Sequence, residues 1–297
     1  MKPSGYERVD QQRQSVSDQI VSLIESGELG EWVREWSGAF SPMNPVSGSE
    51  YTGMNKVGLA VIGAMRGYDD NRWCTFNQAK KMGYRIRKGA KSAVVERWRA
   101  FTQESKDVNP KTGEHDVYTY FKCVGYWSVF NFADMENVPE LERHECVGDF
   151  SVADQLIETS RCPITESGDR AFYSPMLDSV TVPPRESFTA PQAFTLALTH
   201  EMAHSTKKVT GRTGGMFGGP KYAFEELVAE LSSVFTCSEL SVMTPANDTV
   251  KNNAAYLKSW MSACRSDEFT GTEFIYAAAI EASKATDYIV KCYNGQQ

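Results

Sequence analysis

The chain has 297 residues, of which 41% are hydrophobic and 23% are charged, and its formal net charge is −7. This length suits two domains, and the composition is typical of a soluble globular protein. No stretch approaches the roughly 20 apolar residues that a membrane span needs. The polar N-terminus, residues 1–15, lacks the apolar run of a signal peptide. We therefore expect a cytoplasmic protein that does not bind membranes.

The N-terminal half predicts helices followed by a β-hairpin. An amphipathic helix is expected over residues 12–27 and a buried helix over residues 54–66, with a long loop between them. Thr75 is a candidate cap for a short helix that follows it. Two antiparallel strands, joined by a polar loop with an exposed tip, are expected over residues 93–101 and 117–130.

The C-terminal half predicts mainly helices and a few short strands. The strands are expected over residues 170–182, with a break at Pro175, and a glycine-rich mobile loop is expected over residues 211–220. Helices are expected over residues 151–160, 191–206, 221–242, 249–264 and 272–293.

The order of these elements predicts an α+β protein of two domains. The first is a mixed α/β domain, and the second is a mainly helical domain with a small sheet. A polar, acidic segment between them is typical of a linker. The expected boundaries are residues 1–135 for the first domain, 136–148 for the linker and 149–297 for the second domain. The seven cysteines are odd in number and form no CxxC pair, which predicts reduced thiols and no disulfide framework.

Residues 199–205 read THEMAHS and contain an H-E-x-x-H motif. Positions i and i+4 of a helix share one face, so His200 and His204 can bind the same metal ion. Glu201 lies beside that face, where it can act as the base for an attacking water molecule. The motif alone also occurs on helices without metal, so a peptidase site requires further ligands.

A catalytic zinc site needs a third protein ligand. Glu226 and Glu230 are one turn apart on the helix expected over residues 221–242, next to its apolar side. Glu226 as the metal ligand, with Glu230 orienting a histidine, would satisfy both carboxylates. Reversed roles and a solvated acidic face are the alternatives. Tyr222 is a candidate for oxyanion stabilisation. Zn²⁺ is the expected cofactor, with Mn²⁺ and Co²⁺ as alternatives.

Residues 72–99 carry nine basic residues against one acidic residue, interleaved with aromatic residues. Cations neutralise phosphates and aromatic rings stack on unpaired bases, so the segment predicts binding of single-stranded nucleic acid. The alternative is that the rings belong to the core and the charges form a solvated face. The candidate nucleic-acid-binding residues are Trp73, Lys80, Lys81, Tyr84, Arg85, Arg87, Lys88, Lys91, Arg97, Trp98 and Arg99.

The chain resembles the ArdC antirestriction proteins in two sets of segments. The first set resembles their N-terminal domain, which is also similar to the start of the TraC-type primases of conjugative plasmids; it comprises SPMNPVSGSEYTGMN, RWCTFNQAKKMGYRIRKGAK and YWSVFNFADMEN. The second set resembles the zincin-like domain that follows in ArdC and comprises YSPMLDSVTVPPRESF, THEMAHST and YAFEELVAEL. The resemblance covers nearly the whole chain in the same order.

This resemblance implies that the first domain binds single-stranded DNA and that the second has a metallopeptidase fold. It also implies an edge strand that could hold an extended peptide, for which residues 176–182 are the candidate. The hypothesis is an antirestriction protein of a conjugative plasmid that protects incoming single-stranded DNA. Its other partner would be a protein substrate or a host restriction enzyme. The alternatives are a DNA-coating protein with a non-catalytic metal site and a DNA-triggered regulatory protease.

Overall fold

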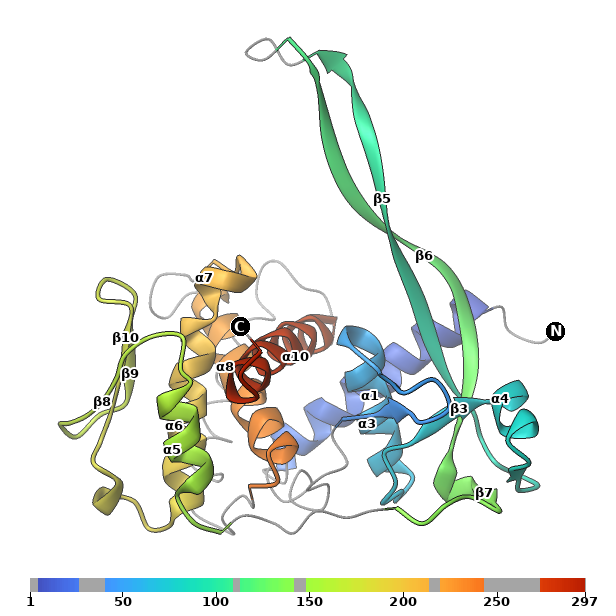
Figure 1. Cartoon of the computed structure of the whole chain (residues 1–297), viewed down its shortest axis with the longest axis horizontal. Coiled ribbons are helices and arrows are strands. Elements are labelled where there is room, and N and C mark those ends of the chain that lie inside the picture. Colours follow the sequence, from blue (N-terminus) through green and yellow to red (C-terminus); the bar gives the residue numbers. More distant parts are fainter. Residues whose placement is uncertain are drawn as a thin grey trace.

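The computed structural model describes residues 5–26, 41–108, 113–141, 148–213, 220–242 and 273–296. It has an α+β architecture in which one long β-hairpin projects from a mainly helical body (Figure 1). The helix expected over residues 249–264 lies outside the described residues, as do parts of the expected loops and linker. Within the described residues, no helix is both long and apolar enough to cross a membrane.

The helices expected in the N-terminal half are confirmed. Thr75 caps the shortest of them through a capping box, in which its Oγ1 accepts a hydrogen bond from the backbone N–H of Gln78 at 3.3 Å. The Gln78 side chain in return accepts one from the backbone N–H of Thr75 at 2.9 Å. The helices are α1 (Gly5–Ser26), α3 (Gly53–Met65) and α4 (Phe76–Lys81).

The hairpin is longer than the sequence predicts. Strands β5 (Ala93–Val108) and β6 (His115–Asn131) pair antiparallel and run through most of the polar segment that was expected to be a loop. In a two-stranded ribbon both faces can meet water, so its outer part needs no apolar alternation. Strand β3 (Trp73–Thr75) adds to the other edge of β6. Short pairs complete this half: β1 (Met43–Asn44) with β2 (Ser49–Glu50), and β4 (Arg85–Ile86) with β7 (Met135–Glu136), which follows the 3-10 turn η1 (Phe132–Asp134).

In the C-terminal half, the described residues contain four of the five expected helices, a short additional helix and a small sheet of three strands. The helices are α5 (Ser151–Glu158), α6 (Pro191–Ser205), α7 (Lys207–Thr210), α8 (Pro220–Glu239) and α10 (Glu273–Tyr293). The strands are β8 (Ile164–Glu166), β9 (Phe172–Ser174) and β10 (Ser179–Val182), followed by the 3-10 turn η2 (Arg185–Ser187).

The strand order in this sheet corrects one expectation. Strand β10 lies in the centre, parallel to β8 and antiparallel to β9. The prediction that residues 176–182 form the edge strand is therefore wrong, because the backbone of β10 is paired on both sides. Strand β9, which pairs with β10 on one side, lies at an edge of this sheet.

The two halves of the chain share one apolar core. The same cluster of buried residues contains Val16 and Leu59 from the N-terminal half and Phe194, Leu227 and Phe274 from the C-terminal half. Helix α10 lies at its centre and contacts α8 and α6 as well as α3 and α1. The core therefore joins the α8 side of the molecule to the base of the hairpin.

A buried ion pair also links the two halves. The side chain of Lys56, on α3, is only 3% exposed. Its Nζ lies 2.7 Å from Glu239 Oε2 on α8 and 2.7 Å from Asp287 Oδ1 on α10. A buried ammonium group is costly unless it is paired, so the three helices are held in a fixed arrangement.

Candidate metal centre

Two neighbouring helices position the residues of the H-E-x-x-H motif and the acidic residues that follow it. Pro191 occupies the first turn of α6, where its fixed φ suits a helix start. Phe194 and Leu198 are fully buried on the same helix. The last turns of α6 therefore lie against α8, and the imidazole rings of His200 and His204 face each other edge-on with centroids 4.9 Å apart.

Glu226 on α8 faces the Nε2 atoms of both histidines. Its Oε2 lies 3.6 Å from His200 Nε2, and its Oε1 lies 3.7 Å from His204 Nε2. One candidate ligand atom from each residue lies within 4.8 Å of the others. Ligand atoms at roughly 2.0–2.2 Å from one tetrahedral ion are about 3.3–3.6 Å apart. The three side chains therefore fit a divalent metal with little movement.

The outer nitrogen of each histidine is held by a second carboxylate. His200 Nδ1 lies 3.1 Å from Glu230 Oε2, and His204 Nδ1 lies 3.2 Å from Glu225 Oε1. Such contacts fix the tautomer and the ring orientation of metal-binding histidines. Glu226 therefore faces the Nε2 atoms, and Glu230 lies behind His200 at Nδ1. The alternative, in which Glu230 is the ligand and Glu226 the outer partner, does not match this geometry.

Glu225 is the residue of this site that the sequence analysis missed. It is 4% exposed and, besides His204, it contacts Arg212 Nε at 3.2 Å and Lys207 Nζ at 3.6 Å. Arg212 comes from the glycine-rich segment that was expected to be a mobile loop, of which residues 214–219 lie outside the described residues. Arg212 also donates to the carbonyl oxygen of Ala203 at 2.9 Å, which ties the start of this segment to α6.

The charges of the cluster explain its pKa shifts. Burial alone would lower the pKa of His200, but the carboxylates of Glu226 and Glu230 outweigh it and raise the pKa to about 10. The pKa of His204 is also raised against its burial, by Glu225 and Glu226. Burial would raise the pKa of Glu226, but its hydrogen bonds to the two histidines lower it. The carboxylates thus create a strong local preference for positive charge, which a divalent ion satisfies.

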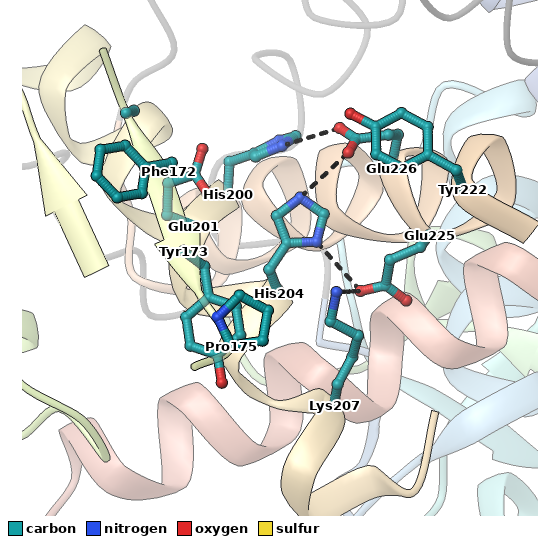
Figure 2. Close-up of a pocket in the computed structure, with 11 residues that line it drawn as sticks. Phe172, Tyr173, Pro175, His200, Glu201, His204, Lys207, Tyr222, Glu225 and Glu226 are labelled. Atoms are coloured by element: carbon teal, nitrogen blue, oxygen red, sulfur yellow. Dashed lines mark hydrogen bonds and ion pairs between the residues drawn. The ribbon is translucent and has the colours of Figure 1, made fainter. Parts of the chain in front are cut away.

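A pocket of about 420 Å³ opens directly above this cluster. Figure 2 shows the histidines, Glu201 and Tyr222 around it. Burial and the hydrogen bond to Glu226 raise the pKa of Tyr222 to about 12, so its hydroxyl stays protonated at neutral pH. The pocket is lined by Ala171, Phe172, Tyr173, Pro175, His200, Glu201, His204, Lys207, Tyr222, Glu225 and Glu226.

Strand β9 forms one wall of the same pocket. Phe172 and Tyr173 belong to β9, and Pro175 follows it directly. Because β9 is an edge strand, an extended chain lying along it would pass over the metal cluster. The site therefore combines three donor groups for a metal, a carboxylate that can act as a base, and a backbone edge that can hold a peptide.

The candidate nucleic-acid-binding residues do not form one surface. The prediction for Trp73 is wrong, because its side chain is 1% exposed within β3 and lies edge-on to Tyr68 in the core, where no base can stack. Tyr84 is half-buried against Phe132. Trp98 is 46% exposed, and its indole N–H donates to Glu96.

The basic candidates are all exposed but belong to two regions. Arg85 is paired with Glu136, and Arg87 donates to the carbonyl oxygen of Ala133 at 3.1 Å. These two lie at the base of the hairpin with Lys80, Lys81, Lys88 and Lys91, whereas Arg97 and Arg99 lie on the hairpin itself. The exposed basic candidates of the segment 72–99 are therefore divided between the base of the hairpin and its length.

The fold and the metal centre define a protein of two domains, the second of the zincin-like metallopeptidase class. The family model of zincin-like metallopeptidases matches residues 151–281, and the model of the N-terminal domain of the anti-restriction factor ArdC matches residues 10–130. The metal-free crystal structure of the antirestriction ArdC protein from plasmid R388 is 31% identical, with a TM-score of 0.69 over 96% of this chain and 98% of that one. The chain therefore belongs to the ArdC antirestriction family.

Two further similarities extend this assignment. The Mn(II)-bound structure of the R388 protein is 29% identical, with a TM-score of 0.66 over 96% of this chain and 99% of that one. Two DNA primases TraC from Escherichia coli are each 28% identical over 93% of this chain. The chain spans only 19% and 27% of the length of these primases.

Proposed function

We propose that this chain is an antirestriction protein that binds single-stranded DNA and protects incoming DNA, and that its metal centre is a metallopeptidase site. Membership of the ArdC family supports the antirestriction role. The similarity to the TraC primases supports contact with DNA. The observation that carries the peptidase part is the donor cluster of His200, His204 and Glu226 beneath a pocket that also contains Glu201.

The chemistry of the donor groups supports a divalent metal. Two imidazoles and one carboxylate suit Zn²⁺, and the R388 protein was solved with Mn(II), so both ions are candidates. The ion would be held by the Nε2 atoms of His200 and His204 and by the carboxylate of Glu226. When bound, such a metal polarises a peptide carbonyl and lowers the pKa of water at the site.

The remaining residues of the site each have a role in this proposal. Glu201 is the base that takes the proton from the attacking water and passes it to the leaving amine. Tyr222, which stays protonated, donates a hydrogen bond to the oxyanion that forms on the carbonyl. Glu230 and Glu225 keep the Nε2 atoms of the two histidines directed at the ion.

The substrate of this reaction would be an extended segment of a protein. Strand β9 is an edge strand beside the pocket, and its free backbone groups can pair with such a segment. The segment would cross the pocket with one carbonyl near the metal cluster. A protein substrate is therefore more consistent with the site than a small molecule.

The test separates catalysis from binding by changing only the base. Metal content, hydrolysis of unfolded protein and transfer of an unmodified plasmid into restricting recipients are measured for wild type, Glu201→Gln and the exposed control Glu186→Gln. We expect Glu201→Gln to retain the metal and to lose hydrolysis by roughly 100-fold or more. Loss of protection together with hydrolysis would support a proteolytic mechanism.

Two outcomes would change the proposal. If Glu201→Gln protects incoming DNA as well as wild type does, protection depends on binding, and catalysis at the metal site is not needed for it. If wild type gives no advantage in restricting recipients over non-restricting ones, the antirestriction role is wrong for this chain.

A further inference from the structure

The middle of the β5–β6 hairpin has an unusual composition. We call residues 97–103 and 117–127 the hairpin stem. The stem contains three basic and seven aromatic residues and no acidic residue. It projects away from the body of the molecule (Figure 1), so both of its faces are open. A stretch this aromatic and this exposed has no partner in the core, and its side chains need another explanation.

The strand register sorts these side chains onto two faces. Arg99 is opposite Lys122, and Phe101 is opposite Tyr120. Opposite residues of an antiparallel pair share a face, and every second residue along a strand returns to it. Arg97 and Tyr118 therefore lie on the same face as these four. We call this set the basic–aromatic face, and it consists of Arg97, Arg99, Phe101, Tyr118, Tyr120 and Lys122.

The positive charges of this face lack counter-charges. Arg99 and Lys122 stand directly opposite each other, an arrangement that destabilises an isolated ribbon. In the part of the chain that the structure describes, no carboxylate forms an ion pair with either of them or with Arg97. The nearest acidic residue along β5, Glu96, is buried and already paired with Arg13 at 2.7 Å. An external anion would relieve this repulsion.

The aromatic rings of this face are exposed and form a row. Phe101 and Tyr120 are stacked, with centroids 5.8 Å apart and ring planes 23° from parallel. Tyr118 continues the row, with its centroid 6.3 Å from that of Tyr120. The three side chains are 38%, 40% and 47% exposed, in the order Phe101, Tyr120 and Tyr118. Ring surfaces held open in this way suit stacking with flat, uncharged groups.

Trp127 places a further ring on the other side of the three cations, toward the base of the hairpin. Gly125 and Trp127 are two residues apart on β6, and a Cβ on Gly125 would lie only 2.5 Å from the Trp127 ring. The ring therefore lies over the backbone of Gly125, which only a glycine permits. Trp127 is 40% exposed in this position, so a fourth ring is available next to Arg97.

We propose that the basic–aromatic face is the binding surface for single-stranded DNA, with phosphates at Arg97, Arg99 and Lys122 and bases stacked on Phe101, Tyr118 and Tyr120. A group of cations next to a row of open rings offers contacts to both the phosphates and the bases of an unpaired strand. A duplex keeps its bases stacked inside and offers no base faces to the rings. This inference rests on the single-strand binding proposed above, and it places the contact on the hairpin and not on residues 80–91.

The size of the face agrees with a short stretch of nucleic acid. Six residue steps separate Arg97 from Gln103, which at about 3.4 Å each gives a surface roughly 20 Å long. This length matches the lower end of known single-strand sites, about four nucleotides. The DNA strand would lie along the hairpin and approach the body of the protein near Trp127.

The test measures binding of a fluorescent oligothymidylate to the full chain by polarisation, across a salt series. One variant, Phe101→Val with Tyr120→Val, removes two rings and introduces β-branched residues that suit a strand. A second, Arg99→Gln with Lys122→Gln, removes two charges. The matched control, Thr102→Ala with Thr119→Ala, changes an opposite pair at the same level on the other face. Lys88→Ala with Lys91→Ala tests the base of the hairpin.

We expect the ring variant to bind at least 20-fold more weakly with an unchanged salt dependence. In the charge variant, the negative slope of the logarithm of the association constant against the logarithm of the salt concentration should be shallower by about 1.4. The control on the other face should bind within twofold of wild type. Circular dichroism and melting curves equal to those of wild type would show that the variants are folded.

Four results would overturn the inference. Equal losses in the ring variant and in the control would mean that the hairpin matters only as a scaffold. Full binding by both hairpin variants, with loss only in the Lys88 and Lys91 variant, would move the site to the base and leave the proposed function intact. A wild-type dimer that the ring variant abolishes, with DNA binding unchanged, would make the face a contact between two copies. If wild type binds no single strand at all, the proposed function itself fails.

Discussion

Replacing Glu225 by glutamine tests the metal centre without changing any proposed ligand or the proposed base. Glu225 Oε1 lies 3.2 Å from His204 Nδ1, and the same carboxylate contacts Arg212 and Lys207. Glutamine keeps the shape of the side chain but removes its charge. His204 then loses the anion that orients its ring and makes its Nε2 a better donor to a metal.

The expected effect on metal binding follows from these contacts. Loss of an outer partner of a metal-binding histidine typically costs 10- to 100-fold in affinity, about 1.4–2.7 kcal/mol. We expect the upper part of this range for Glu225→Gln. The reason is that the side chain of Arg212, which is only 6% exposed, would then lie unneutralised next to a divalent cation.

The assay is a competition titration of Zn²⁺ and Mn²⁺ against a chromophoric chelator. Glu230→Gln makes the equivalent change behind His200, and Glu158→Gln removes one exposed charge on α5, away from the site. We expect Glu225→Gln and Glu230→Gln to bind the metal more weakly than wild type, and Glu158→Gln to bind it with wild-type affinity. Wild-type affinity in Glu225→Gln, combined with strong loss in Glu226→Gln, would refute the role that we give to the outer carboxylates.

Three further predictions concern stability, pH and the hairpin. Lys56→Met should lower the free energy of unfolding by about 3 kcal/mol, because it leaves carboxylates on α8 and α10 without their buried cation; chemical denaturation beside the exposed control Lys284→Met tests this. Metal affinity should fall by about 10- to 100-fold from pH 7 to pH 6, since the raised pKa of His200 lets protons compete with the ion; calorimetry in buffers of different ionisation enthalpy counts the protons, and a pH-independent affinity would contradict it. Gly125→Ala should displace the ring of Trp127, which ¹⁹F NMR of fluorotryptophan-labelled protein would detect as one shifted resonance.

The sequence predicted those elements whose signals are local. The apolar periodicity of α1, α6, α8 and α10 identified these helices, and Thr75 as a candidate cap identified the start of α4. The histidines of the H-E-x-x-H motif come together through helix geometry alone. Glu226 could be inferred because it lies on the next long helix, at the edge of its apolar side.

Other features depend on tertiary structure and have no local signal. The outer half of the hairpin contains polar residues on both faces, so nothing in its pattern distinguishes strand from loop. The central place of β10 follows from its pairing with β8, a strand that the sequence analysis did not predict. Trp73 lies in a basic segment, yet β3 pairs with the edge of β6 and its Trp73 side chain is buried against Tyr68 and the Gly63 backbone of α3.

The outer partners of the metal site were hidden for a similar reason. Glu225 is adjacent to Glu226, so on a helix it points about 100° away from it, and the sequence alone assigned it no partner. The role of Glu225 depends on its contact with Arg212. The sequence analysis assigned Arg212 to a mobile loop because the surrounding segment is rich in glycine. An arginine that directly precedes a glycine-rich stretch and lies near a metal motif was the one signal that could have indicated it.

The position of α10 limits how this protein can be divided into fragments that fold. Because this helix is surrounded by α1 and α3 on one side and by α6 and α8 on the other, neither half can be expressed alone without exposing part of its interior to water. A fragment of residues 149–297 would keep every residue of the metal cluster and still be expected to aggregate. The similarity to the much longer TraC primases, which covers 93% of this chain and therefore includes both halves, agrees with this constraint.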